Sequence, residues 1–139
     1  MTVKSQIKNY IASQAEPKRG DLQTLHQSII KKYPDVKLWF LDGRDESGKQ
    51  ITNPNIGYGT QSMHYANGSS REFYRVGFSA NTTGISVYII GLADKNYLKQ
   101  TFGKTIGKAT VTGYCIKFKK LADIDMEVLM QAVSFNLNR

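Results

Sequence analysis

The hydrophobic pattern of this chain changes its period at Pro34, and this change constrains the fold more than any other feature. Before Pro34, apolar residues recur at spacings of three and four, which predicts amphipathic helices over 5–13 and 17–33. After Pro34, short apolar or alternating runs lie between turn residues and predict strands over 37–41, 60–65, 72–79, 85–90 and 114–118. A short helix is expected after Asp94, and a closing helix from about Asp125. The order of these elements predicts an α+β domain with N-terminal helices, an antiparallel sheet of about five strands and a C-terminal helix.

Two turn-rich connectors set the direction of the central strands. Ala66–Ser69 and Asn81–Gly84 have the length and the residue types of hairpin connections, so we expect the strands beside them to pair as an antiparallel meander. Side chains alternate between the two faces along a strand, and we expect Tyr74, Val76 and Phe78 to share the face that packs into the core.

Length and composition predict one domain over 1–139. The chain has 139 residues, of which 40% are hydrophobic and 22% are charged, and these values are typical of a single globular domain. The single cysteine, Cys115, excludes an intrachain disulfide, and no apolar stretch has the length of a signal peptide or of a membrane-spanning helix. We therefore expect a cytoplasmic protein, monomeric or homodimeric, that does not associate with a membrane.

The glycine-rich segments match no nucleotide-binding motif. Three residues, not four, separate Gly103 from Gly107, and Ala109 stands where a phosphate-binding loop needs a hydroxyl group. An anion-binding turn and a plain flexible connector both remain open for this segment. Gly57–Gly59 lacks the third glycine of a dinucleotide motif and predicts a turn or bulge, and the polar segment 42–55 predicts a loop.

Positive charge is concentrated in one part of the sequence. The chain has 19 Lys and Arg residues against 11 Asp and Glu residues, a formal net charge of +8, and the stretch from Lys95 to Lys120 holds seven lysines and no acidic residue. Such a stretch indicates a surface that faces anions. We therefore expect a small non-enzymatic binding or accessory domain whose partner is a small anionic ligand or an acidic protein. The predicted ligand-binding residues are Arg71, Arg75, Lys104, Lys108, Lys117, Tyr58 and Asn81.

Aromatic residues interleave with these lysines and leave weak nucleic-acid binding as an alternative. Tyr97, Phe102, Tyr114 and Phe118 have faces on which bases could stack. The core also needs aromatic residues, however, and the seven basic residues are all Lys, without the Arg that is favoured for bidentate contacts with bases and phosphates. A solvated basic face is the simpler interpretation.

No residue pattern predicts a catalytic residue, a metal ligand or a cofactor. His26 and His64 have no neighbouring Cys, His or carboxylate at the spacing of metal ligands, and the carboxylates are scattered. Cys115 alternates with its neighbours in a predicted strand, which is typical of a small buried side chain. An enzyme that uses Cys115, or a pair such as Tyr114 and Lys117, is left as a further alternative.

Several segments along the chain carry a family resemblance. They are Leu38–Gly43, Asn53–Gly59, Arg71–Tyr74 and Ser79–Tyr88, with Tyr10–Ala12 and Glu16–Arg19 before them and Gly103-Lys104 and Gly113–Ile116 after them. Together they resemble the YdhG-like domain-of-unknown-function family over essentially the whole chain. The resemblance implies a compact α+β domain, with helices packed on an antiparallel sheet, and it implies no established enzymatic activity.

Some members of this family are described as frataxin-like iron chaperones that serve iron–sulfur cluster assembly, so the resemblance adds iron binding as an alternative function. Frataxins present an acidic surface on their first helix and strand. The region of the first two predicted helices of this chain instead carries six basic residues against Glu16 and Asp21. Because iron needs carboxylate and imidazole ligands, which are sparse there, no iron ligand can be assigned residue by residue.

Overall fold

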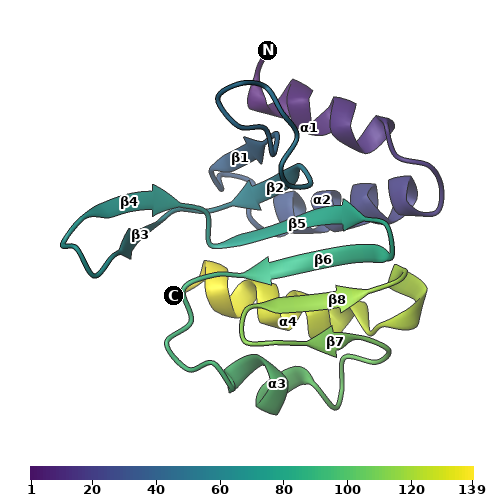
Figure 1. The fold of residues 1–139 in the computed structure, drawn as a ribbon. Coiled ribbons are helices and arrows are strands. Elements are labelled where there is room, and N and C mark those ends of the chain that lie inside the picture. The colour runs from purple at the N-terminus through teal and green to yellow at the C-terminus, as the bar shows by residue number, and fades with distance from the viewer.

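Six antiparallel strands form the main sheet of the computed structural model, which describes residues 1–139 (Figure 1). In spatial order they are β1 (Leu38–Leu41), β2 (Asn55–Tyr58), β5 (Val76–Asn81), β6 (Gly84–Ile89), β8 (Cys115–Phe118) and β7 (Thr110–Val111). A separate hairpin of β3 (Gln61–His64) and β4 (Ser70–Phe73) projects from one side of the molecule (Figure 1). With helices at both ends of the chain, this architecture confirms the predicted α+β class.

The helices lie mainly over one face of the sheet. They are α1 (Val3–Ala12), α2 (Lys18–Lys32), α3 (Tyr97–Phe102) and α4 (Met126–Leu137), with a short 3-10 helix, η1, over Leu121–Asp123. In Figure 1, α2 and α4 lie behind the sheet, α1 lies above it at the β1 edge, and α3 lies beside β7. None of the helices combines the length and the apolar character needed to span a bilayer.

Capping side chains fix where α1 and α4 begin. The hydroxyl oxygen of Thr2 accepts a hydrogen bond from the N–H of Ser5 at 3.1 Å, and Oδ1 of Asp125 accepts one from the N–H of Glu127 at 3.0 Å. These caps satisfy N–H groups that have no partner within a helix. The prediction that the closing helix begins near Asp125 is therefore confirmed.

The core lies between the sheet and the helices that cover it. Alternate residues of the central strands point into this core, and each is at most 1% exposed: Ile56, Tyr58, Val76, Phe78, Ile85, Val87 and Ile89. The helices add residues at spacings of three and four, among them Ile7, Ile11, Leu22, Leu25, Ile29, Leu129 and Val133. Full burial of each large apolar side chain contributes about 1.5–3 kcal/mol, so this layer supplies most of the stability of the fold.

The strands differ from the predicted ones in three places. Asn55–Tyr58 forms β2, so the predictions of a turn or bulge at Gly57 and of a loop that reaches Asn55 were wrong. The short edge strand β7 was not predicted. The predicted strand over 72–79 is divided at Tyr74 and Arg75 into β4 and β5. The hairpin that contains β4 therefore leaves the main sheet instead of continuing it.

This division places the Tyr74 ring on the open face of the sheet, so the prediction that Tyr74 shares the face of Val76 and Phe78 was wrong. Gly57 and Gly77 are paired in register on β2 and β5. A Cβ atom on Gly57 would lie 2.3 Å from Cδ2 of Tyr74, and one on Gly77 would lie 2.6 Å from its Cε1. The ring therefore occupies the flat surface that two glycines leave, and it is only 4% exposed.

Replacement of Gly77 by Ala is expected to lower the free energy of unfolding by about 1–3 kcal/mol, because the new methyl group would overlap the Tyr74 ring and, to a smaller extent, the Ile56 carbonyl oxygen at 2.8 Å. Urea denaturation measures the change. The matched control is Gly20→Ala in α2, where the methyl group meets only the end of the flexible Glu16 side chain, and stability should stay the same or rise by up to about 1 kcal/mol. If Gly77→Ala lowers the free energy of unfolding as much in the Tyr74→Ala variant as in the unsubstituted protein, this explanation is contradicted.

Candidate functional site

Two of the predicted ligand-binding lysines lie at one surface hollow near the end of β8. Lys108 and Lys117 line this hollow of about 470 Å³, and Lys119 is a third lysine beside them. We call these three lysines and their hollow the basic hollow. Thr83, Ala109, Thr110, Phe118 and Asp123 complete its lining. The basic hollow therefore collects residues from the β5–β6 turn, the segment before β7, and β8 with the residues that follow it.

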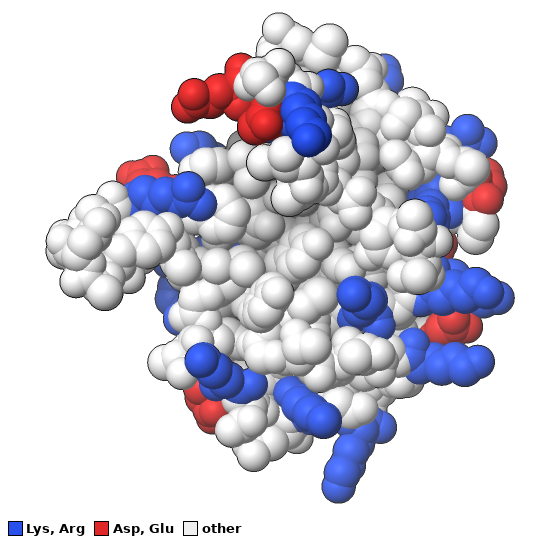
Figure 2. Space-filling model, in the orientation of Figure 1, with Lys and Arg blue, Asp and Glu red and all other residues white.

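A predicted lysine from the same basic stretch, Lys104, lies at an adjacent hollow. This second hollow, of about 530 Å³, is lined by Lys99 and Lys104, and Ala109 belongs to the lining of both hollows. Figure 2 shows basic side chains around the lower and right-hand rim of the molecule, where Figure 1 places α3, β7 and β8. The stretch 95–120 thus forms a basic rim at one edge of the sheet.

The lysines of the basic hollow have no partner within the protein. The one ion pair of the structure joins Arg19 to Glu16 at 3.3 Å, and Asp123 makes none despite its place in the hollow. Among lysine side chains, only Lys18 and Lys32 donate hydrogen bonds, to the Asn81 carbonyl and the Ser134 hydroxyl. The ammonium groups of the hollow are therefore available to an external anion.

The other four predicted residues do not meet at the basic hollow. Tyr58 is fully buried in the core, and Arg71 lies on the projecting hairpin with its guanidinium 5.1 Å from the centre of the Phe73 ring. Arg75 is half-buried, and its Nε donates a hydrogen bond to the Thr60 carbonyl at 2.9 Å. Asn81 builds the β5–β6 turn, where its Nδ2 donates to the hydroxyl oxygen of Ser86 at 2.9 Å. These residues support the fold at separate places.

Most aromatic residues of the basic stretch are used by the fold. Phe102 and Phe118 are 6% and 4% exposed, and Tyr97 stacks on Phe135 with ring centroids 4.5 Å apart. Only Tyr114, at 58% exposed, offers an open ring. Cys115 is buried, and burial raises the pKa of its thiol, which favours the weakly nucleophilic protonated form. No group of three or more His, Cys, Asp or Glu side chains is arranged to hold a metal ion.

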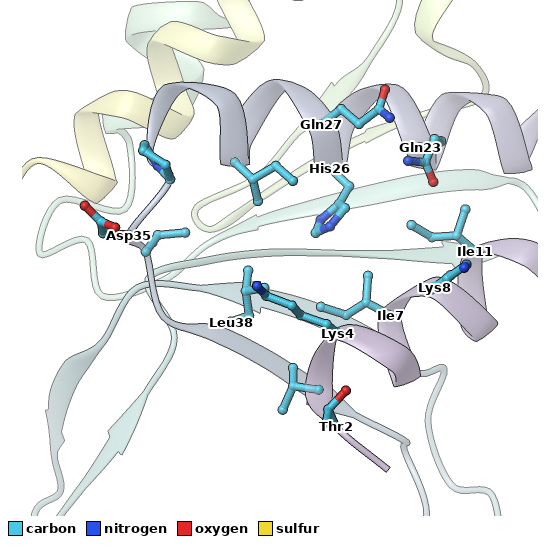
Figure 3. Close-up of a pocket in the computed structure, with 14 residues that line it drawn as sticks. Thr2, Lys4, Ile7, Lys8, Ile11, Gln23, His26, Gln27, Asp35 and Leu38 are labelled. Carbon is cyan, nitrogen blue, oxygen red and sulfur yellow. The ribbon is translucent and has the colours of Figure 1, made fainter.

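The structure has a groove between α1 and α2 that sequence reasoning missed. It has a volume of about 840 Å³, and its lining combines apolar residues of both helices and of the start of β1 with Lys4, Lys8 and His26 (Figure 3). The apolar stripe of α1 and the helical spacing of Lys4 and Lys8 were visible in the sequence. The groove itself depends on how the two helices are placed in space, which local spacing does not determine.

A buried hydrogen bond orients His26 at this groove. Nδ1 of His26 lies 2.6 Å from the hydroxyl oxygen of Tyr58. Burial raises the pKa of Tyr58 well above its ordinary value and lowers the pKa of His26, so the hydroxyl is protonated and the imidazole neutral. Because the Tyr58 hydroxyl has no other partner, it satisfies its proton only by donating to Nδ1. The remaining ring N–H of His26, at Nε2, is then free to serve a ligand.

Comparisons with known proteins add no relative. The chain matches no family model, and no curated protein or solved structure is significantly similar to it. The YdhG-like resemblance therefore rests on sequence segments alone and stays a prediction. The basic hollow and the α1–α2 groove are the two surfaces whose geometry bears on binding.

The free energy of unfolding is expected to fall as the pH falls below about 6.5, the ordinary pKa of histidine, because the unfolded chain takes up a proton there before buried His26 does. The His26→Gln variant, which keeps a hydrogen-bond acceptor for Tyr58, should lose part of this dependence. Denaturation curves between pH 5 and 8 measure it. The control is His64→Gln on the exposed hairpin, which should keep the profile of the unsubstituted protein; equal profiles for all three proteins would contradict the prediction.

Proposed function

We propose that this protein is a non-enzymatic binding domain whose basic hollow receives a small anion that carries phosphate or carboxylate groups. The observation that carries the proposal is that Lys108, Lys117 and Lys119 line one hollow and that none of them forms an ion pair with an acidic residue. Several cations at one concave surface attract anions, and their attraction grows when no internal acid neutralises them.

The segment that carries Lys108 is held firmly at the hollow. The N–H of Lys108 donates to the Asp123 carbonyl at 2.9 Å, and the N–H of Asp125 donates to the Ile106 carbonyl at 2.8 Å. Gly107 between them has a φ of +103°, and a Cβ atom there would lie 2.7 Å from the Asp123 carbonyl oxygen. Glycine is thus required for the close approach of this segment to η1. This support favours an ordered ligand-binding loop over a flexible connector.

The lining of the hollow suits an anion that stays partly hydrated when it is bound. Three ammonium groups and the hydroxyl groups of Thr83 and Thr110 are hydrogen-bond donors for phosphate or carboxylate oxygens. Asp123 lies in the same lining and reduces the positive charge that an anion meets. Because all three lysines are exposed, each contact contributes modestly and is weakened by salt.

Nucleic-acid binding and iron binding receive less support than an anion site. Weak nucleic-acid binding would use the same lysines, but Tyr114 is the only aromatic residue of the stretch with an open face for a base. Iron binding would need a cluster of carboxylate or imidazole ligands, and the described side chains form none. A small anion at the basic hollow needs neither exposed aromatic rings nor a cluster of metal ligands.

Pyrophosphate at millimolar concentration and low ionic strength is expected to raise the Tm by about 3–8 °C, because a ligand of the folded state stabilises it. Sodium chloride at matched ionic strength is the reference. The combined variant Lys108→Gln, Lys117→Gln, Lys119→Gln should lose most of this rise. The matched control variant, Lys31→Gln, Lys49→Gln, Lys95→Gln, loses the same amount of charge, but its substituted lysines lie outside the basic hollow and outside the second hollow. This variant should keep the rise in Tm.

Two results would overturn the proposal. One is a Tm that pyrophosphate raises no more than sodium chloride does, which would leave the hollow without an anion of this class. The other is an equal loss in both lysine variants, which would assign the effect to net charge alone. Steeply salt-dependent binding of an unspecific oligonucleotide, stronger than that of pyrophosphate, would favour the nucleic-acid alternative instead.

A further inference from the structure

We propose that the groove between α1 and α2 is a second binding site, for a small amphipathic carboxylate with an aliphatic body. This inference goes beyond the proposed function, because it concerns another surface and another class of ligand. It rests on three features of the groove: its size, its apolar floor, and a set of hydrogen-bond donors on its walls (Figure 3).

The floor of the groove is apolar and large enough for a small molecule. Ile7 and Ile11 of α1 line the groove but are only 1% and 3% exposed, so its accessible apolar surface comes mainly from Ile30 of α2 and from Val36 and Leu38, which are half-buried. Its volume of about 840 Å³ lies within the range of about 300–1,000 Å³ that is usual for small-molecule sites. An aliphatic chain placed on this floor would remove apolar surface of both partners from water, which is the main source of affinity for such ligands.

The donors of the groove lie on opposite walls and have no partner within the protein. Lys4 and Lys8, one turn apart on α1, form neither an ion pair nor a hydrogen bond. His26 of α2 points into the groove, and its Nε2–H is free because Nδ1 accepts from Tyr58 (Figure 3). Two cations and a neutral N–H donor beside an apolar floor complement a carboxylate head with an apolar body.

The remaining polar residues narrow the choice of ligand. Asp35 lies at the far end of the groove, where it disfavours a second negative charge on the ligand (Figure 3). Gln23 and Gln27 line the α2 wall as neutral groups. A polyphosphate would therefore meet both the apolar floor and Asp35. A monocarboxylate has a single charge, which it can place beside one of the two lysines: the Lys4 side chain ends near Leu38 and the Lys8 side chain near Ile11 (Figure 3).

Titration of the full chain with decanoate, below its micelle concentration, tests the site. A ligand of this size is expected to bind with a Kd on the order of 0.1–1 mM. In ¹H–¹⁵N spectra, the shifted amide signals should belong to residues 3–11, 23–30 and 36–38, which surround the groove. Decan-1-ol should bind at the same place more weakly, and decyltrimethylammonium and acetate should bind weakest, because each lacks the charge or the body that the groove selects.

Charge variants separate the site from unspecific binding. The double variant Lys4→Gln, Lys8→Gln changes only exposed side chains, and it should weaken decanoate at least about fivefold while it leaves decan-1-ol unchanged. The matched control, Lys31→Gln, Lys49→Gln, lies outside the groove and should change neither affinity.

The proposal is overturned if decanoate fails to bind below about 5 mM, if it binds no tighter than decan-1-ol, or if both lysine variants weaken it equally. Decanoate signals that map to the basic hollow would also overturn it. Because pyrophosphate is expected at the basic hollow and decanoate at the groove, either proposal can fail while the other stands.

Discussion

A tyrosine ring that lies on two paired glycines determines where the chain bends between β4 and β5. Tyr74 covers Gly57 and Gly77 on the face that the helices leave open, and no larger residue fits beneath the ring at either position. To reach this place the chain leaves the strand direction at Arg75, which divides one predicted strand in two and turns the β3–β4 hairpin out of the sheet. Arg75 then donates from Nη1 to the Asn136 carbonyl at 3.4 Å, and Nδ2 of buried Asn136 donates to the Arg75 carbonyl. The same bend therefore anchors the end of α4, where a cation near the last carbonyls is also favourable.

The central strands point their apolar side chains into the core, and this explains where the residues behind the net charge of +8 lie on the surface. The sheet places its apolar residues toward the helices, so lysines lie at the rim at β7 and β8 and on the exposed side of α1 that borders the groove. At the rim, the pairing of the Lys108 segment with η1 brings separate lysines to one hollow. At α1, Lys4 and Lys8 border an apolar groove instead. Positive charge thus borders two surfaces of different chemistry, a polar hollow for which we propose a compact anion and an apolar groove for which we propose an amphipathic one.

The parts of the fold that depend on local spacing could be predicted from the sequence, and those that depend on contacts across the sheet could not. Helical spacing located α1 and α2, and the acidic cap Asp125 located the start of α4. β2 was missed because Gly57 resembles a turn residue until its pairing with Gly77 is known. The same holds for the site: the basic stretch contained Lys108, Lys117 and Lys119, but only the arrangement of β8 beside the loop shows that all three border one hollow. The charge of Arg75 was visible in the sequence, whereas its hydrogen bonds to the Thr60 and Asn136 carbonyls depend on the fold and were not.

The central claim is that the positive charge of this chain acts at a defined place rather than as a diffuse field. Mapping of pyrophosphate binding by ¹H–¹⁵N spectra, with sodium chloride at equal ionic strength as the reference, tests it most directly. The account predicts that the largest changes occur at Thr83, at 108–110 and at 117–119, and that amides around the α1–α2 groove do not respond. Changes of similar size beside every exposed lysine, or none beyond those caused by sodium chloride, would contradict it.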